Sequence, residues 1–390
     1  MLRFLGSNQL IVYNLWGKYL ESKFDIRILA VILLLVVIGA YVLLGQQPEP
    51  SPGNGDQNEP DIPGEPEEPS TEPEEPVTEP EEPETETPPE MALQFTKTGT
   101  LMDIGSPHDI EVSGDFAYIA DSFNEIRILD VSDKGNPMEI GAYNPTGPRR
   151  GQGVFYSEPY LYIADGLGMQ ILNVTYASDP SEISFHHTSG FASKIQVSGE
   201  FAYIADREGG LLIVNVSDLG NPWQIGRYFE AGSVHVLDVA ISGDYAYVAM
   251  EGQGLRIVNV SDPANPNEVG FLDTKGSAEA LLVSGSTVYM ADGEDGLRVI
   301  DVSDPSLPTE IGFYDTSGYA KDVFLANGYV YVGDGTSRML LVCDASDPKS
   351  IELVGEYETP GYVWGIYIAD SYAYIANGEN GIFILHQVLS

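Results

Sequence analysis

One tyrosine recurs through most of the chain at a nearly constant interval. It lies at the same place in seven successive units, as Tyr118, Tyr162, Tyr203, Tyr247, Tyr289, Tyr331 and Tyr374. The flanking residues repeat as well, since YIAD at 118–121, 162–165 and 203–206 becomes YMAD at 289–292 and YIAN at 374–377. Such a period indicates a repeat architecture in which each unit is one supersecondary element.

Each unit contains four short apolar segments separated by turn residues. In residues 276–318 these segments are LLVSG, TVYMAD, LRVIDVS and TEIGFYDT, with Gly-, Asp- and Pro-rich turns between them. Val, Ile and Tyr favour strands, and nothing beyond residue 90 shows a sustained helical period. Four strands per 41 to 44 residues are typical of a propeller blade. The sequence therefore predicts an all-β, seven-bladed β-propeller over residues 91–390.

The two ends of the array predict how the ring closes. The last unit stops after GIFILH and lacks its fourth strand. Before the first unit lies the segment Leu93–Gly105, whose MDIG resembles MEIG (138–141) and TEIG (309–312) at fourth-strand positions. We expect this N-terminal segment to supply the outer strand of blade seven, which leaves no open edge strand.

These repeats resemble those of the LVIVD-repeat family. The clearest match is GLRIVNVSDPANPNEVG (254–270), followed by GLRVIDVSDPSLPTEIG (296–312). The resemblance covers about residues 94–386, although the second copy (MQILNVTYASDPSEIS) departs from the pattern and the seventh lacks its tail. It implies a propeller on a prokaryotic cell surface, and it implies no defined activity.

A membrane anchor is expected before the repeats. Ile28–Gly45 is eighteen residues without a charge, long enough for a transmembrane helix. Four basic residues precede this span and none follows it until Lys97. The positive-inside rule then places residues 1–27 in the cytoplasm and the propeller outside the cell. A cleaved signal peptide is the alternative.

Residues 46–90 connect the anchor to the propeller. They contain the heptads EPEEPST, EPEEPVT and EPEEPET, with sixteen acidic residues and no Lys or Arg. Proline prevents helix formation and the carboxylates repel one another, so this segment is predicted to be a disordered, extended stalk.

Net charge and cysteine content restrict the partners. The chain carries a net charge of −41, so nucleic acid is not expected as a ligand. The single cysteine, Cys343, excludes an intrachain disulfide and occupies a slot that other units fill with Ile or Val. We expect it to be a buried apolar residue.

The repeat itself separates structural from functional candidates. Asp121, Asp165, Asp206, Asp292 and Asp334 end the second strand of most units and are expected to accept N–H groups in the following turn. Asp133, Asp218, Asp262, Asp304 and Asp347 recur in the Pro-containing turns and are interpreted in the same way. Neither set predicts a metal site, and no cofactor is predicted.

The residues just before each first strand vary from unit to unit. In a propeller they converge on the mouth of the central channel. The candidate ligand-binding residues are His108, Asp109, Arg149, Arg150, Gln152, Lys194, Asp238, Glu279, Lys321, Asp322 and Trp364. The simpler interpretation is a set of solvated loop residues around a water-filled pore.

Three Asn residues form N-glycosylation sequons, namely Asn173, Asn215 and Asn259. Each also stands where other units have Asp in DVS, so repeat variation is an equally simple explanation.

These features predict a membrane-anchored binding or adhesion module whose ligand is a surface protein or a glycan. The first alternative is a propeller hydrolase or lyase, which would use carboxylates and His108 at the channel mouth. The second is a scaffold subunit of a surface complex.

Overall fold

The computed structural model describes residues 93–389, apart from 124, 145–149 and 230–234. The predicted cytoplasmic segment 1–27, transmembrane helix Ile28–Gly45 and stalk 46–90 lie outside these residues. Within the described part, no helix has the length and apolar character needed to cross a membrane.

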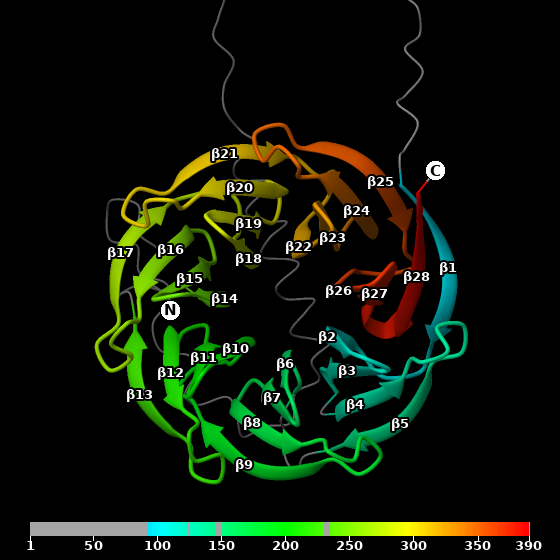
Figure 1. Ribbon diagram of the computed structural model, residues 1–390, viewed down its shortest axis with the longest axis horizontal. Helices are drawn as coiled ribbons and strands as arrows, with labels where there is room; N and C mark the ends of the chain where they lie inside the picture. The colour runs from blue at the N-terminus through cyan, green and yellow to red at the C-terminus, as the bar shows by residue number, and fades with distance from the viewer. Residues whose placement is uncertain (1–92, 124, 145–149, 230–234, 390) are drawn as a thin grey trace, which may run out of the picture. The chain divides into compact units, whose positions relative to one another are not determined.

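Seven four-stranded antiparallel sheets form a ring around a central axis (Figure 1). Blade one holds β2 (Pro107–Ser113), β3 (Phe116–Asp121), β4 (Glu125–Asp130) and β5 (Met138–Tyr143). Blade two holds β6 (Gly153–Ser157), β7 (Tyr160–Ala164), β8 (Gly168–Asn173) and β9 (Ser181–His187). Blade three holds β10 (Lys194–Ser198), β11 (Phe201–Ala205), β12 (Leu211–Asn215) and β13 (Trp223–Tyr228). Blade four holds β14 (Val236–Ser242), β15 (Tyr245–Met250), β16 (Gly254–Asn259) and β17 (Asn267–Leu272).

The remaining blades continue this order from the channel outward. Blade five holds β18 (Ala280–Ser284), β19 (Thr287–Ala291), β20 (Leu297–Asp301) and β21 (Thr309–Tyr314). Blade six holds β22 (Ala320–Ala326), β23 (Tyr329–Asp334), β24 (Met339–Asp344) and β25 (Glu352–Glu358). Blade seven holds β26 (Gly365–Ala369), β27 (Tyr372–Ala376) and β28 (Ile382–Leu389), and the short 3-10 helix η1 (Gly378–Asn380) lies between the last two. The predicted seven-bladed propeller is confirmed.

The ring closes as the sequence predicts, through an N-terminal strand. Strand β1 (Leu93–Leu101) pairs antiparallel with β28 and becomes the outer strand of blade seven. The predicted match of MDIG to the fourth-strand motif is wrong, however. Gly99 pairs with Ile384 just as Gly141 of MEIG pairs with Ile128, so TKTG (96–99) is the equivalent segment. Gly105 of MDIG instead lies against the Asp121 carboxylate, in the loop leading to blade one.

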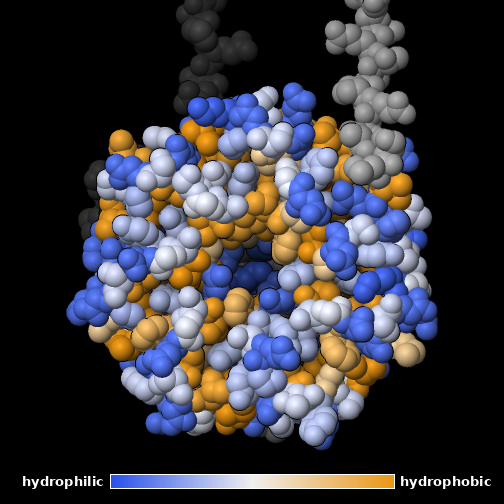
Figure 2. Space-filling model, in the orientation of Figure 1, coloured by the Kyte–Doolittle hydropathy of each residue, from blue (hydrophilic) through white to orange (hydrophobic). Residues whose placement is uncertain are grey.

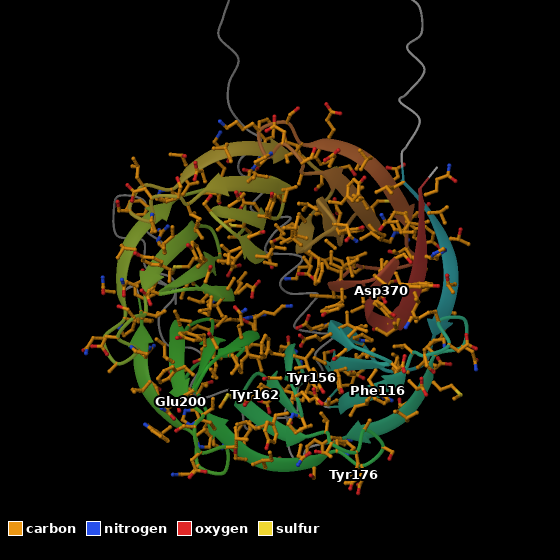
Figure 3. All side chains as sticks on the ribbon, viewed as in Figure 1. Phe116, Tyr156, Tyr162, Tyr176, Glu200 and Asp370 are labelled. Carbon is orange, nitrogen blue, oxygen red and sulfur yellow. The ribbon has the colours of Figure 1, made fainter. Side chains whose placement is uncertain are left out.

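The recurring tyrosine explains the core. All seven of these side chains are at most 5% exposed, and each lies on the second strand of its blade. Figure 3 shows Tyr162 within blade two, whereas Tyr176 projects from the outer edge, where it is 75% exposed. Buried apolar residues gather in seven clusters, each shared by two neighbouring blades. Hydrophobic burial between blades therefore holds the ring together. Cys343 is fully buried in one of these clusters, as predicted.

A glycine in the outer strand lets most blades contact the next blade closely, whereas blade two has Ser184 at this position. A Cβ on Gly226 would lie 1.9 Å from the carbonyl oxygen of Pro263, and one on Gly312 would lie 2.1 Å from that of Pro348. In the same way, a Cβ on Gly99 in β1 would lie 2.0 Å from the carbonyl oxygen of Lys134 in blade one. The closing strand thus makes the same contact between blades as the outer strands within the array.

The closure predicts the effect of filling this contact. Gly99→Val places side-chain atoms where the Lys134 carbonyl already lies, and overpacking of this kind costs about 3 kcal/mol or more of unfolding free energy when backbone must move. Thr96→Val, an exposed change in the same strand, is the control and should be nearly neutral. Chemical denaturation measures both. Equal stabilities for the two variants would contradict the closure described here.

Candidate functional site

The channel mouth is formed by seven equivalent residues, one from each blade. Each lies ten positions before the recurring tyrosine: His108, Gln152, Ser193, Leu237, Glu279, Lys321 and Trp364. We call these seven residues the mouth ring. The sequence placed such residues before the first strands, but His108, Leu237 and Lys321 lie within β2, β14 and β22. There each is the extra residue of a β-bulge and has no partner on the neighbouring strand.

The mouth ring encloses a small pocket. Its volume is about 60 Å³, and Lys194 and Arg207 complete the lining. Viewed along the propeller axis in Figure 2, the centre of the molecule is hollow, with apolar residues around the rim of the hollow and hydrophilic residues at its base. The structure therefore brings together six of the predicted site residues, which are His108, Gln152, Lys194, Glu279, Lys321 and Trp364.

Trp364 is the centre of an aromatic cluster at the mouth. The His108 ring stacks on it with centroids 4.2 Å apart and an interplanar angle of 16°. Tyr362 packs against it at 4.5 Å, and the Lys321 ammonium lies 5.5 Å from its ring centroid. These contacts leave Trp364 half-buried. It positions His108 and Lys321 in addition to any contact with a ligand.

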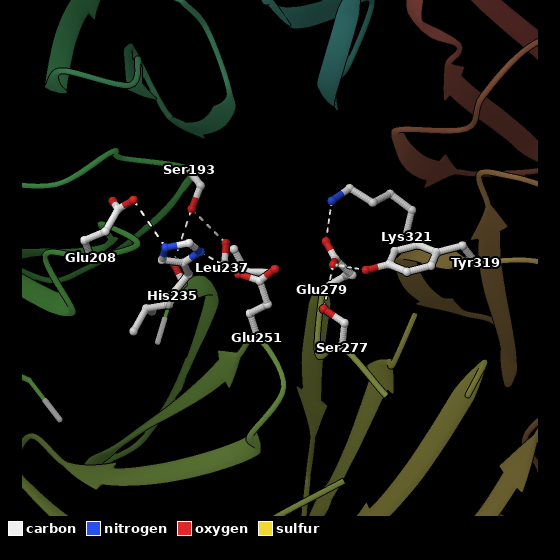
Figure 4. Close-up of polar contacts among 10 residues, drawn as sticks. Ser193, Glu208, His235, Leu237, Glu251, Ser277, Glu279, Tyr319 and Lys321 are labelled. Carbon is white, nitrogen blue, oxygen red and sulfur yellow. Dashed lines mark hydrogen bonds and ion pairs between the residues drawn. The ribbon is translucent and has the colours of Figure 1, made fainter. Parts of the chain in front are cut away.

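Glu279 is held by three neighbouring side chains (Figure 4). Lys321 forms an ion pair with it, Tyr319 donates a hydrogen bond to it, and Ser277 donates one at 2.9 Å. Burial by itself raises the pKa of Glu279, but Lys321 and these hydrogen bonds more than offset it, and the pKa falls below its ordinary value. Glu279 is therefore ionised at neutral pH and paired.

His108 is uncharged at neutral pH. Burial lowers the pKa of its imidazole, and the nearby Lys321 charge lowers it further, against a hydrogen bond with Gln152 that raises it. The ring can therefore both donate and accept a hydrogen bond at the mouth.

A second ring of residues lies one layer deeper in the channel. It consists of Asp109, Gly153, Lys194, Asp238, Ala280, Asp322 and Gly365, each paired with the residue two after the recurring tyrosine. The three aspartates fasten neighbouring blades, because each accepts the backbone N–H of the next innermost strand. The donors are Val154 for Asp109, Leu281 for Asp238 and Ile366 for Asp322, at 2.7 to 2.9 Å.

Lys194 supplies the cation for these carboxylates. Its ammonium donates to Asp109 at 2.8 Å. Burial disfavours the charged amine, but Asp109, Asp322 and Asp238 together raise its pKa above the ordinary value. One lysine does not compensate three buried carboxylates. Burial raises the pKa of Asp238 to about 7 and that of Asp322 to about 6, although Lys194 opposes both shifts.

The third layer of the channel is more apolar. Glu111, Phe155, Gln196, Ala240, Leu282, Phe324 and Tyr367 face one another across from the recurring tyrosines. Together with Asp109, Lys194, Asp238 and Asp322 of the second ring they line a cavity of about 290 Å³. Burial raises the pKa of Glu111 to about 8, and its carboxylate accepts the Tyr156 N–H. In the part of the chain that the structure describes, no group of His, Cys, Asp and Glu is arranged to hold a metal ion.

Arg150 is not among the residues that line the mouth pocket. Arg149 lies outside the described residues. Arg150 is exposed, and its backbone N–H binds the Asp165 carbonyl at 2.9 Å.

The recurring second-strand aspartates hold the loops that carry the mouth ring. Asp121 accepts the N–H of Phe123 in the following turn, as predicted, but also that of Ser106, fifteen residues earlier. Asp334 likewise accepts the N–H groups of Gly318 and Tyr319 from the loop before blade six. The predicted contact with the following turn is confirmed for Asp121, Asp165 and Asp334. Asp206 and Asp292 instead accept the N–H groups of Gly190 and Gly276 in the preceding loop. Blade four has Met250 at this position, which offers no oxygen.

The sequon asparagines have a structural role of their own. Asn215 Oδ1 accepts the N–H and the hydroxyl of Ser217, at 3.0 and 2.6 Å. Asp130 makes the same two contacts with Ser132 in a blade that has no sequon. Asn173 and Asn259 also accept the N–H two residues on. This Asx turn explains Asn at all three positions, and glycosylation stays a prediction.

Sequence reasoning missed two features near the mouth. His235 bridges Glu251 and Glu208, with Nδ1–Oε2 and Nε2–Oε1 distances of 2.5 and 3.3 Å, and so links blades three and four (Figure 4). Arg207 lines the pocket from the turn after β11. Arg207 breaks the repeat at a position that is mostly glycine, so a blade-by-blade comparison of turns could have found it.

Fold and channel define the class of protein as a seven-bladed β-propeller with a polar mouth. The family model described as LVIVD repeat matches residues 104–145, 148–188, 189–229, 233–274, 275–316, 317–359 and 360–385. The chain therefore belongs to the LVIVD-repeat family. No curated protein sequence matches it.

Solved structures share the fold at low sequence identity. The β-propeller domain of Cps50 (Swd1) from Myceliophteria thermophila is 12% identical with a TM-score of 0.61, over 75% of this chain and 99% of that one. The computationally designed Ika8 protein is 8% identical with a TM-score of 0.56, over 74% of this chain and 99% of that one. These likenesses show the fold alone.

The second ring predicts a pH dependence of stability. The Asp238 pKa is raised in the folded state, so the folded protein binds more protons than the unfolded chain between about pH 4 and pH 7. The stability that this proton contributes is fully present below the pKa that Asp238 has in the unfolded chain. It is lost as the pH rises through the higher pKa that Asp238 has in the folded protein. The Asp238→Asn variant lacks this titrating group, so its unfolding free energy does not fall in this way. Relative to that of the wild type, its unfolding free energy rises by on the order of 1 kcal/mol per pH unit from pH 5 to 7.

Urea denaturation at several pH values measures this difference. Asp262→Asn, in an exposed turn, is the control and should track the wild type. Parallel curves for Asp238→Asn and the wild type would show that the channel carboxylate is not protonated in this range.

Proposed function

We propose that this propeller is a recognition module that binds a partner protein at its channel mouth. The observation that carries the proposal is the composition of the mouth ring. Seven equivalent positions hold seven different side chains, whereas the core tyrosine ten residues later is the same in every blade. Folding needs the repeat, so a specific site arises where the repeat is broken.

Size favours a protein partner over a small-molecule substrate. Ligand pockets usually enclose about 300–1,000 Å³, whereas the mouth pocket offers about 60 Å³. That space admits the end of one side chain. A partner loop that inserts one polar group while its flanks rest on the mouth ring fits this geometry. A glycan terminus is the competing ligand.

The state of Glu279 supports binding over catalysis. A general acid at neutral pH needs a raised pKa, whereas Lys321, Tyr319 and Ser277 hold this carboxylate in its ionised form. The carboxylates of the second ring accept backbone N–H groups from the next blade, which is a structural task. A hydrolase or lyase remains the alternative proposal, with His108 as its base.

We place this module on the outside of the cell membrane, with residues 28–45 as its anchor and 46–90 as its stalk. The support is the uncharged span, the basic residues confined to its N-terminal side and the acidic Pro-rich composition that follows. A propeller carried on such a stalk would meet partners at some distance from the membrane. The binding role is then recognition or adhesion between surfaces, and a scaffold role in a surface complex uses the same mouth.

The mouth hypothesis is tested by a matched pair of leucine variants. Leu237→Ala removes a mouth-ring side chain, and Leu307→Ala removes a 69% exposed side chain from a turn on the opposite face. We expect Leu237→Ala to weaken binding of a surface partner by about 1 kcal/mol or more, and Leu307→Ala to have no effect. Trp364→Ala should cost about 2 kcal/mol of binding. It should also lower the melting temperature, because Trp364 supports His108 and Lys321.

Binding is measured by biolayer interferometry of residues 46–390 against partners isolated from surface extracts. Equal loss in Leu237→Ala and Leu307→Ala would show that the effect is not specific to the mouth. No loss in either leucine variant or in Trp364→Ala would place the interface on the outer blade edges.

Topology is tested by proteolysis of intact cells. Protease should cut within residues 46–90 and release the propeller, while residues 1–27 stay protected by the membrane. Release of the N-terminal segment would invert the proposed orientation. Free propeller in the absence of protease would indicate a cleaved signal peptide.

A further inference from the structure

Arg207 has a backbone conformation that its residue type disfavours. It comes directly after the recurring second-strand aspartate of its blade. At the same position four other blades have glycine, namely Gly166, Gly293, Gly335 and Gly378. The φ angle is +39° at Arg207, and it is +58° at Gly293 and +55° at Gly378. A side chain in this left-handed region is strained, and such strain gathers at functional sites. Arginine here therefore stands against the backbone preference of the turn.

The Arg207 side chain lacks the partner that an arginine usually has. Its guanidinium lies 4.6 Å from the Phe191 ring centroid, which fixes its direction. Its Nε is buried and has no hydrogen-bond acceptor. In the described part of the chain no carboxylate forms an ion pair with it, whereas Arg256 and Arg298 each bind an aspartate at 2.8 Å. An unsatisfied buried donor is costly unless a ligand completes it.

Arg207 is also the basic residue of the mouth pocket that forms no ion pair with a carboxylate among the described residues. Lys194 and Lys321 line the same pocket, but Asp109 and Glu279 neutralise them. This occurs in a region, residues 91–390, that holds 41 acidic and 14 basic residues. A basic group without a carboxylate in so acidic a domain points to an anion from outside the chain.

We propose that the mouth pocket is a carboxylate-binding subsite, in which Arg207 receives an Asp or Glu side chain of the partner protein. This inference rests on the proposed recognition function and specifies its ligand. A guanidinium matches a carboxylate with two parallel hydrogen bonds. One water needs roughly 10–15 Å³ of such volume, so 60 Å³ holds a carboxylate and little else.

The test uses the full chain in nanodiscs with ¹⁵N-labelled arginine and tryptophan. Two blocked tripeptides, acetyl-Gly-Glu-Gly-amide and its Gln counterpart, are titrated while the Arg207 Nε–H and Trp364 indole N–H signals are followed. We expect the Glu peptide to shift both signals saturably and the Gln peptide to bind at least about tenfold more weakly, the factor that corresponds to one charge-assisted hydrogen bond.

Arg207→Gly separates binding from folding. It relieves the strained φ, so its melting temperature should equal or exceed that of the wild type, while the Trp364 response to the Glu peptide is lost. Arg338→Gly is the matched control, because Arg338 is exposed, also has a positive φ (+61°) and lies outside the pocket lining. It should bind the peptide normally.

Three results would overturn the subsite. They are equal binding of the Glu and Gln peptides, unchanged Glu binding in Arg207→Gly, and binding of methyl glucuronide in place of the peptide, which would make the ligand an acidic sugar. The proposed recognition function has its own test in Leu237→Ala. If Leu237→Ala loses partner binding while Arg207→Gly leaves peptide binding unchanged, the mouth remains the interface and only the carboxylate subsite is excluded.

Discussion

The pairing of β1 with β28 is the constraint on which the rest of the structure depends. Every blade buries one face against the preceding blade and the other against the following one, so no blade can complete its core alone. The first and last blades meet only because residues from the two ends of the repeat array share one sheet. Gly99 then contacts the Lys134 carbonyl as the other outer-strand glycines contact their neighbours. The mouth ring exists because this closure brings Trp364 of blade seven against His108 of blade one.

Within the propeller, some polar groups hold neighbouring blades together and others face the channel. Asp109, Asp238 and Asp322 tie three pairs of neighbouring blades through backbone N–H groups, in a layer where Lys194 offsets their charge. Desolvation of these carboxylates is tolerated because the hydrogen bonds satisfy their oxygens. One layer higher, the mouth ring has no such common task, and its residues differ in every blade. Along the channel, a layer whose aspartates hold blades together is thus followed, one residue away, by a layer whose side chains differ in every blade.

The fold could be predicted well from the sequence because the pattern of one blade recurs seven times. One tyrosine per unit, four apolar segments and a missing final strand were enough to infer the blades and their closure. The MDIG match failed because a short apolar-Gly word occurs both in outer strands and in the loop at Gly105, and only strand register separates them. The partial burial of Trp364 could not be predicted, for another reason. Its cover comes from His108, more than 250 residues away in sequence, which repeat comparison cannot reveal. Arg207 was missed because the site candidates were taken from the residues before each first strand. A comparison of the turns after the second strand would have singled it out, whereas its φ angle and unpaired Nε needed the structure.

The central claim is that the repeat builds the scaffold and its departures at the mouth bind the partner. Hydrogen–deuterium exchange of the propeller, with and without a bound surface partner, tests this most directly. The account predicts that added protection is confined to the loops that carry the mouth ring, among them 106–108, 189–193, 275–279 and 360–364. Protection concentrated instead in the Pro-containing turns of the opposite face, or along the outer strands β13, β17 and β21, would contradict it.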